Sequence, residues 1–295
     1  MKNKLLELTF SFTGNTANQN IIDLYDVSQA LIGFQRSIAL TTHLVLNDEI
    51  ITQSPSLKGA NIFALPPEAG SWKINAAVVL TATAAYNIAT TPNNTPLGHL
   101  IFSLYDYVIS ESLGVHVDYN KSLGELYEQA EKDKLKIPLI KQYQADSLIE
   151  KCSTAIKEMH RPIYKTETAT SASIVANFAG EKIPLKTNLT FGSYEFISET
   201  LTSNEAETFT GRIQSYNSNT FKGRVYIAEF GRPVSFELKD NIRNEAVIRI
   251  ITASLSANAL KLYSDSFSTV TFTAFKNESK IGYLKSLNII YVKTT

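Results

Sequence analysis

Four titratable side chains between residues 106 and 118 could form a catalytic or metal site. They are Asp106, Glu111, His116 and Asp118. One residue separates His116 from Asp118, so a strand would place both side chains on the same side. A metal-dependent hydrolase or nuclease uses carboxylates and imidazoles as ligands and as general acids or bases. Polar surface residues near a helix end would produce the same pattern, and we favour that interpretation.

Other catalytic signatures are absent from the sequence. It contains no Gly-x-Gly-x-x-Gly loop, no Walker-type Gly-Lys-Ser/Thr loop and no Gly-x-Ser-x-Gly elbow. No two of its four histidines stand at helical ligand spacing. Cys152 falls on the apolar stripe of a predicted helix without a nearby histidine, which indicates a buried structural thiol. We predict no catalytic residue, no metal and no cofactor, and therefore expect a protein that acts by binding.

The longest periodic segment, Asn20 to Leu46, predicts an amphipathic helix with Asn20 as its N-cap. Its apolar residues define the side expected to face the core: Leu24, Val27, Leu31, Phe34, Ile38 and Val45. The opposite side carries what we call the polar line, which consists of Asp26, Gln29, Gly33 and Arg36. Either the line is solvated, or the small residue within it lets another backbone approach. We expect it to be the interface for self-association or for a protein partner.

The patterns along the chain predict an α+β protein. Residues 1–120 are expected to form an α/β domain, with two long helices on a small sheet that includes the alternating strand Leu5 to Phe12. The second long helix should begin at a Thr95 cap and end before Gly114. Residues 121–165 read as a helical connector and residues 166–205 as a β-rich linker. Residues 206–295 should form a separate β domain.

The C-terminal domain is expected to be all-β. Its predicted strands are Thr208–Tyr216, Thr220–Glu229, Val234–Leu238, Ala246–Thr252, Thr269–Lys276 and Leu284–Val292. A further strand is predicted before them, at Tyr194–Phe196. Short, closely spaced antiparallel strands favour a small closed barrel of the OB or SH3-like kind, because closure removes exposed edges.

Basic and polar residues gather around two turns of this predicted barrel. Arg212, Tyr216, Asn219, Lys222 and Arg224 surround the first hairpin, and Lys280 and Lys285 flank the last one. Cations neutralise phosphates while exposed rings stack on bases, so these residues make nucleic-acid binding the first alternative to a protein partner. From Ala206 onward there are 12 Lys and Arg against 7 Asp and Glu. That excess is small for a dedicated nucleic-acid-binding domain.

Composition indicates a cytoplasmic protein. The formal net charge is zero and 44% of the residues are hydrophobic, which is typical of a globular chain. A single cysteine fits a reducing compartment. We find no signal peptide at the start. The most apolar run, residues 76–89, is too short to span a membrane and is expected to be a buried strand or helix.

Several segments resemble a family of uncharacterised bacterial proteins. They are DLYDVSQALIGFQRS, THLVLNDEIITQSPSLKGA, PPEAGSWK, LGHLIFSLYDYVISESLG and FTGRIQSYNSNTFKGRVYI. The resemblance covers nearly the whole chain and implies an N-terminal helical α/β part joined to a C-terminal β part, in a bacterial cytoplasm. It assigns no activity and no residue role. Proteins of this sort often lie in mobile or phage-related gene neighbourhoods, which associates the chain with defence or counter-defence.

Overall fold

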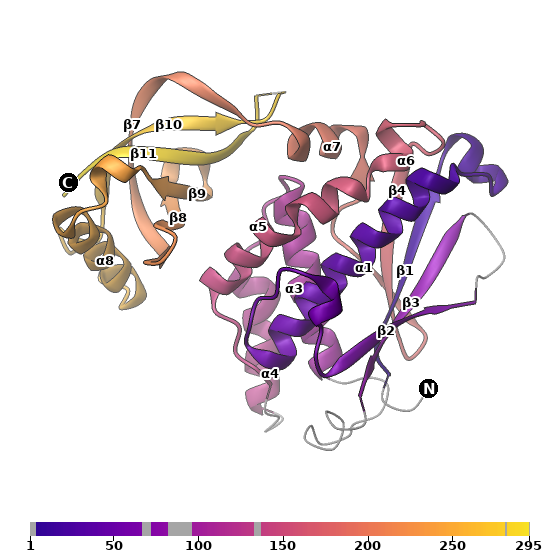
Figure 1. Ribbon diagram of the computed structural model, residues 1–295. Helices are drawn as coiled ribbons and strands as arrows, with labels where there is room; N and C mark the ends of the chain where they lie inside the picture. Colours follow the sequence, from indigo (N-terminus) through magenta and orange to yellow (C-terminus); the bar gives the residue numbers. More distant parts are fainter. Residues whose placement is uncertain (1–3, 67–71, 82–95, 133–136, 281, 295) are drawn as a thin grey trace. The chain divides into compact units, whose positions relative to one another are not determined.

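The computed structural model describes residues 4–66, 72–81, 96–132, 137–280 and 282–294 (Figure 1). It confirms the α+β class and contains two sheets. The chain divides into two units, Met1–Ile197 and Ser198–Thr295, and each has its own hydrophobic core. This division differs from the four segments expected, because the residues predicted as connector and most of those predicted as linker pack within the first unit.

The first unit is built on an antiparallel sheet with the order β2-β3-β1-β4-β5, and β6 also pairs with β4. Its strands are β1 (Lys4–Thr13), β2 (Ala60–Leu65), β3 (Lys73–Leu80), β4 (Ser171–Phe178), β5 (Glu181–Pro184) and β6 (Leu189–Thr190). The alternation in β1 confirms the predicted strand, because Leu6, Leu8, Phe10 and Phe12 are all buried. β4 joins this sheet from the stretch predicted as a linker.

Helices pack beside this sheet, and Figure 1 shows α1, α3 and α5 lying together. The helices are α1 (Leu24–Asn47), α3 (Pro96–Ser112), α4 (Glu125–Lys132), α5 (Gln142–Glu158), α6 (Arg161–Tyr164) and α7 (Phe191–Ser198). Short helical turns are η1 (Asn15–Gln19), η2 (Ser54–Ser56) and the π-turn η3 (Asn120–Gly124). The ring of Phe34 on α1 lies 4.8 Å from that of Phe10 on β1, which joins the helical layer to the sheet.

The helix α1 begins later than its sequence predicted, and the set of its residues that is buried differs in part from the predicted one. Its N-cap is Asp23, whose side chain accepts a hydrogen bond from the backbone N–H of Asp26 at 2.9 Å. Asn20 instead takes a left-handed conformation at the end of η1. Val27, Phe34, Ile38 and Val45 are buried as expected, whereas Leu24 is 78% exposed. The reason is that α1 is covered on two sides, so most of its middle and C-terminal turns are buried.

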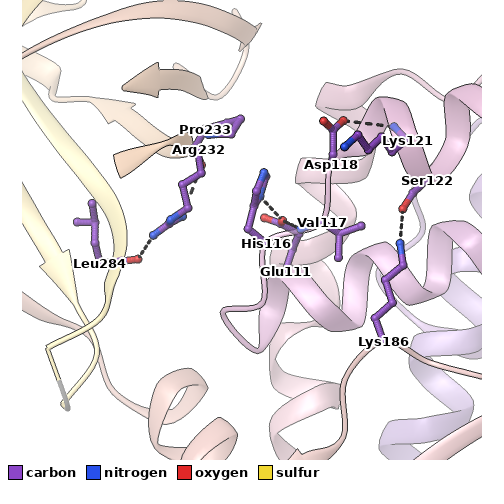
Figure 2. A network of polar contacts seen from close by, with 10 residues as sticks. All are labelled: Glu111, His116, Val117, Asp118, Lys121, Ser122, Lys186, Arg232, Pro233 and Leu284. Carbon is purple, nitrogen blue, oxygen red and sulfur yellow. Dashed lines mark hydrogen bonds and ion pairs between the residues drawn. The ribbon is translucent and has the colours of Figure 1, made fainter. Parts of the chain in front are cut away.

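The second unit is a closed barrel in which the strands pair in the ring β7-β8-β9-β11-β10. They are β7 (Leu201–Asn217), β8 (Lys222–Ile227), β9 (Arg232–Leu238), β10 (Val270–Glu278) and β11 (Leu284–Thr294). All neighbours are antiparallel except β9 and β11, which run parallel. At the start of these two strands, Arg232 Nη2 donates to the carbonyl oxygen of Leu284 at 2.8 Å (Figure 2).

Two predicted strands are helices, and one of them, α8, lies in the barrel unit, which is therefore not all-β. Residues 246–252 lie in α8 (Glu245–Ala259), which connects β9 to β10, and residues 194–196 lie in α7. The isoleucines of α8 favour a strand by propensity, but Asn244 caps the helix by accepting from the backbone N–H of Val247 at 3.1 Å. Val247, Ile251, Ser254 and Ala257 are then buried at helical spacing. The turns η4 (Ala228–Phe230) and η5 (Asp240–Ile242) complete the unit.

Within the ranges described above, none of the helices combines the length and the apolar character that crossing a membrane requires. The expected cap at Thr95 and the apolar residues 82–89 lie outside the described residues.

Candidate functional site

The structure brings together two of the four candidate hydrolase residues, Glu111 and His116 (Figure 2). Glu111 Oε1 lies 2.8 Å from His116 Nδ1 and accepts a hydrogen bond from the backbone N–H of Val117 at 2.8 Å. Between them the chain reverses at Gly114, whose φ of +81° is the left-handed conformation that suits glycine after a helix. Residues 115–118 are not in a strand, which corrects the predicted arrangement of His116 and Asp118. The Glu111 carboxylate thus secures the chain leaving α3.

The other two candidates make separate contacts. Asp106 is buried on α3, and its Oδ1 accepts from the backbone N–H of Lys186 at 2.8 Å. Burial raises the pKa of the Asp106 carboxyl, and the contacts with Lys186 and Ser110 oppose that shift. Asp118 Oδ1 accepts from the backbone N–H of Lys121 at 3.3 Å (Figure 2). Among the described residues, no three His, Cys, Asp or Glu side chains converge in a way that could hold a metal.

Two residues of the polar line are covered by other helices of the same unit. Asp26 is 3% exposed, and its Oδ1 accepts from Arg161 Nε at 2.9 Å. A Cβ placed on Gly33 would stand 2.3 Å from the carbonyl oxygen of Ala155 on α5. At these two positions the close approach therefore takes place within the chain, against α5 and α6.

The open side of α1 is apolar and begins just before the helix. Its exposed residues are Ile21, Leu24, Tyr25 and Ile32. The guanidinium of Arg161 lies 5.2 Å from the centre of the Tyr25 ring, at cation–π distance. Gln29 and Arg36, the remaining residues of the polar line, are partly exposed. The spacing of Ile21, Tyr25 and Ile32 by four and seven residues was a signal in the sequence, but the stronger core stripe obscured it.

The basic and polar side chains around the first barrel hairpin are less exposed to solvent than the sequence suggested. Arg212 lies with its guanidinium 4.8 Å from the centre of the Tyr263 ring. Tyr216 stacks on Phe236, with the ring centres 6.5 Å apart, and burial raises the pKa of its hydroxyl. Arg224 is only 4% exposed. Lys222 is partly exposed at the start of β8, and Asn219 is exposed in the preceding turn.

The two predicted basic clusters lie at opposite ends of the barrel. Asn217 at the end of β7 pairs with Lys222, beside the first turn. Leu201 at the start of β7 pairs with Glu278, beside the last turn. In that last turn Lys280 is exposed. Nearby, Lys285 Nζ donates to the Glu199 carbonyl oxygen at 3.0 Å and to Thr200 Oγ1 at 2.6 Å. The clusters therefore do not form one patch.

An aromatic surface between α8 and β10 was not predicted from the sequence. Tyr263 is 50% exposed and Phe267 is 53% exposed. Their segment is ordered, because Ser268 Oγ donates to the Tyr263 carbonyl oxygen at 3.1 Å and Asp265 Oδ1 accepts from the Phe267 N–H at 3.0 Å. Arg212 stacks on Tyr263 and pairs in register with Tyr226 on β8. We call Arg212, Tyr226, Tyr263 and Phe267 the aromatic surface.

The chain belongs to a family of unknown function. Residues 8–194 match a domain of unknown function, DUF7946, which covers more than half of the chain. Residues 205–293 match a second model, the family of unknown function DUF7947. The two matches agree with the two-part family that the sequence resembles. No curated protein and no solved structure matched the sequence.

Proposed function

We propose that this protein acts by binding, without chemistry of its own, and that its barrel holds single-stranded nucleic acid. The connectivity of the barrel carries the proposal. Five strands close in the order first-second-third-fifth-fourth, the third and fifth run parallel, and a helix joins the third to the fourth. This arrangement supports an OB-type barrel rather than an SH3-like one. OB barrels bind oligonucleotides across their second and third strands, which here are β8 and β9.

The aromatic surface supplies the chemistry for such a ligand. Tyr263 and Phe267 present half-exposed rings on an ordered segment. Every base has a flat face that can stack on such a ring, so stacking does not depend on the nucleotide sequence. Arg212 joins these rings to β8, where Tyr226 lies between the core residues Val225 and Ile227. Lys222 is partly exposed at the start of the same strand. A single-stranded nucleic acid with one base stacked on Tyr263 would therefore run on across β8, the second strand of the barrel.

Charge in the barrel unit predicts that stacking contributes more than phosphate contacts. Ser198–Thr295 holds 12 Lys and Arg against 9 Asp and Glu. Several of these cations are already in ion pairs, such as Arg243 with Glu237 at 3.0 Å and Lys276 with Glu207 at 2.7 Å. With two or three phosphate contacts, the logarithm of affinity should fall against the logarithm of salt with a slope of about −2.

The test is a fluorescence anisotropy titration of the full chain against a labelled oligothymidine of about 15 nucleotides, a length that one OB barrel can cover. We expect saturable binding at low salt, weaker binding to a duplex of equal length, and a several-fold loss in Lys222→Glu. The control Lys293→Glu makes the same charge change on an exposed side chain near the end of β11. Absence of binding at low salt, or equal affinity for the duplex, would reject the proposal.

We also propose that the first unit contacts a protein partner or a second copy through the open side of α1. Four large exposed apolar residues on and just before one helix support this, because apolar patches of that kind are common at protein interfaces. Light scattering on the wild-type chain and on Ile32→Asp tests self-association. A monomeric mass for both proteins over the accessible concentration range would leave only a different protein as partner.

A cytoplasmic setting is proposed for the same protein. Its one cysteine, Cys152, is fully buried, and burial raises the pKa of the thiol to about 12. Such a thiol is inert and suits a reducing compartment.

A further inference from the structure

A hollow of about 410 Å³ lies beside α1 in the first unit, one helical turn beyond Ile32 of the open side. It is lined by Arg36, Thr52, Gln53, Ser54 and Pro55. It is a shallow depression, largely open to solvent, and therefore has room for a small ligand bound on one side. The hollow therefore lies between Arg36, the last residue of the polar line, and residues 52–55, which lead into and begin the turn η2.

Arg36 is the charged group of this hollow, and it has no counter-ion among the described residues. Its guanidinium carries five N–H donors, of which one is used, from Nη2 to the Thr52 carbonyl oxygen at 3.1 Å. Its Nε–H is shielded from solvent and meets no acceptor in the described part of the chain. A partly buried guanidinium in this condition is unusual, because buried charges are normally paired.

The acidic residues that follow Arg36 most closely in the sequence are directed elsewhere. Asp48 accepts a hydrogen bond from Gln144 Nε2 at 2.6 Å, which binds it to α5. Glu49 lies 3.8 Å from His43 Nε2. Neither carboxylate therefore forms an ion pair with the Arg36 guanidinium, although both follow it within 13 residues.

The remaining wall of the hollow suits an anion. Thr52, Gln53 and Ser54 contribute uncharged polar side chains, and no acidic side chain lines the hollow within the described residues. Hydroxyl and amide groups can donate to an oxyanion while the guanidinium forms two parallel hydrogen bonds with it. A phosphate or carboxylate placed here would use donors that the described residues leave free, and it would meet no acidic side chain among them.

We propose that this hollow is a binding site for a small oxyanion, a phosphate or a carboxylate, held by the terminal nitrogens of Arg36 and by the side chains of residues 52–54. The proposal is independent of nucleic-acid binding, because the site lies in the other unit. Its ligand is a small anionic molecule rather than a second protein, since only one charged side chain and a short segment of chain line the space.

The experiment follows the full chain by thermal unfolding and by NMR of arginine Nε–H groups, with chloride, acetate and inorganic phosphate at equal ionic strength. We expect phosphate or acetate to raise the melting temperature in a saturable way and to shift the Arg36 Nε–H signal. A response to phosphate alone identifies a phosphate site, and a response to acetate alone identifies a carboxylate site. If neither anion exceeds chloride in either measurement, the proposal is wrong.

Variants separate this site from general charge effects. Arg36→Gln should remove the response, and Arg36→Lys should weaken binding about tenfold or more, because lysine keeps the charge but loses the planar fork. Arg249→Gln is the matched control, since it removes one positive charge from an exposed helix of the barrel unit. If Arg36→Gln folds and still responds like the wild type, Arg36 is not the ligand-binding group.

Discussion

Gly33 on α1 faces the backbone of Ala155 on α5 so closely that no side chain fits between them. A Cβ on residue 33 would lie 2.3 Å from the Ala155 carbonyl oxygen and 3.2 Å from Met159 Cγ. The first distance is far shorter than any normal contact with a backbone atom, and a backbone atom cannot swing aside. The two helices are therefore held at a separation that only glycine permits at this position.

Replacing Gly33 with alanine should destabilise the first unit by about 1–3 kcal/mol, since overpacking forces the two helices apart. Urea denaturation followed by circular dichroism measures the loss. Gly192→Ala on α7 is the control, because its new Cβ would meet nothing nearer than Thr190 Oγ1 at 3.8 Å. There we expect little change or a gain of about 0.5–1 kcal/mol, from the better helix propensity of alanine. Equal effects at both sites would contradict the close approach.

The Asp26–Arg161 pair should be costly to break from either side. Asp26 is buried, and its Oδ2 has no partner in the described chain, so it depends on the 2.9 Å contact between Oδ1 and Arg161 Nε. Arg161→Leu leaves an unpaired buried carboxylate and should cost about 3 kcal/mol. The double variant Asp26→Leu/Arg161→Leu should be more stable than the sum of the single losses predicts. Strict additivity in this cycle would show that the two side chains do not interact.

Whether a side-chain contact could be predicted depended on how far apart its two residues lie in the sequence. The Glu111–His116 contact is local, and its two residues were already grouped as candidates because they lie close together in the sequence. Asp106 was placed in the same group because its true partner, Lys186, lies 80 residues further along. Arg212 and Tyr263 are likewise brought together by β7 and the segment after α8.

The same limit explains the differences in secondary structure and burial. The strand β1 followed from its own alternation, because one face of it is buried. The periodicity of α1 predicted its core side correctly at Val27, Phe34, Ile38 and Val45. It did not predict the second buried side, where α5 covers Gly33. In α8, β-branched residues favoured a strand, and only the Asn244 cap and the fit to the barrel core decided for a helix.

His160 should make stability depend on pH below neutrality. Burial lowers its pKa to about 4 from 6.5, although two backbone hydrogen bonds oppose the shift. Nδ1–H donates to the Ile156 carbonyl oxygen at 2.8 Å, so the neutral ring leaves Nε2 to accept from Ser193 Oγ at 2.9 Å. Between pH 6.5 and 4 the unfolded chain binds a proton that the folded chain excludes. Stability is therefore complete above pH 6.5 and falls as pH decreases.

The contribution of His160 to this loss is on the order of 3 kcal/mol at pH 4. Denaturation of the wild type and of His160→Gln at pH 7 and pH 4.5 measures it. We expect the difference in stability between the two proteins to shrink as pH falls, since the variant has no proton to exclude. Parallel pH profiles would show that folding does not lower the pKa of this ring.

Tyr263→Ala should weaken oligothymidine binding about tenfold, because stacking on one ring contributes about 1–3 kcal/mol per base. The tyrosine is half exposed, so its removal should leave the melting temperature nearly unchanged. Tyr291→Ala is the matched control, since this ring is 55% exposed on β11 and lies outside the aromatic surface. Loss of affinity in both variants alike would place the ligand elsewhere on the barrel.

The position of β1 in its sheet has a consequence for synthesis. β1 begins at residue 4 and pairs on one side with β3 and on the other with β4, whose residues 171–178 emerge from the ribosome much later. Until then the nascent chain carries an unpaired edge along one of its most apolar strands, which invites pairing with other chains. Such distant pairing also slows folding. A fragment that ends before β4 should therefore aggregate, whereas one that ends after residue 197 completes the sheet.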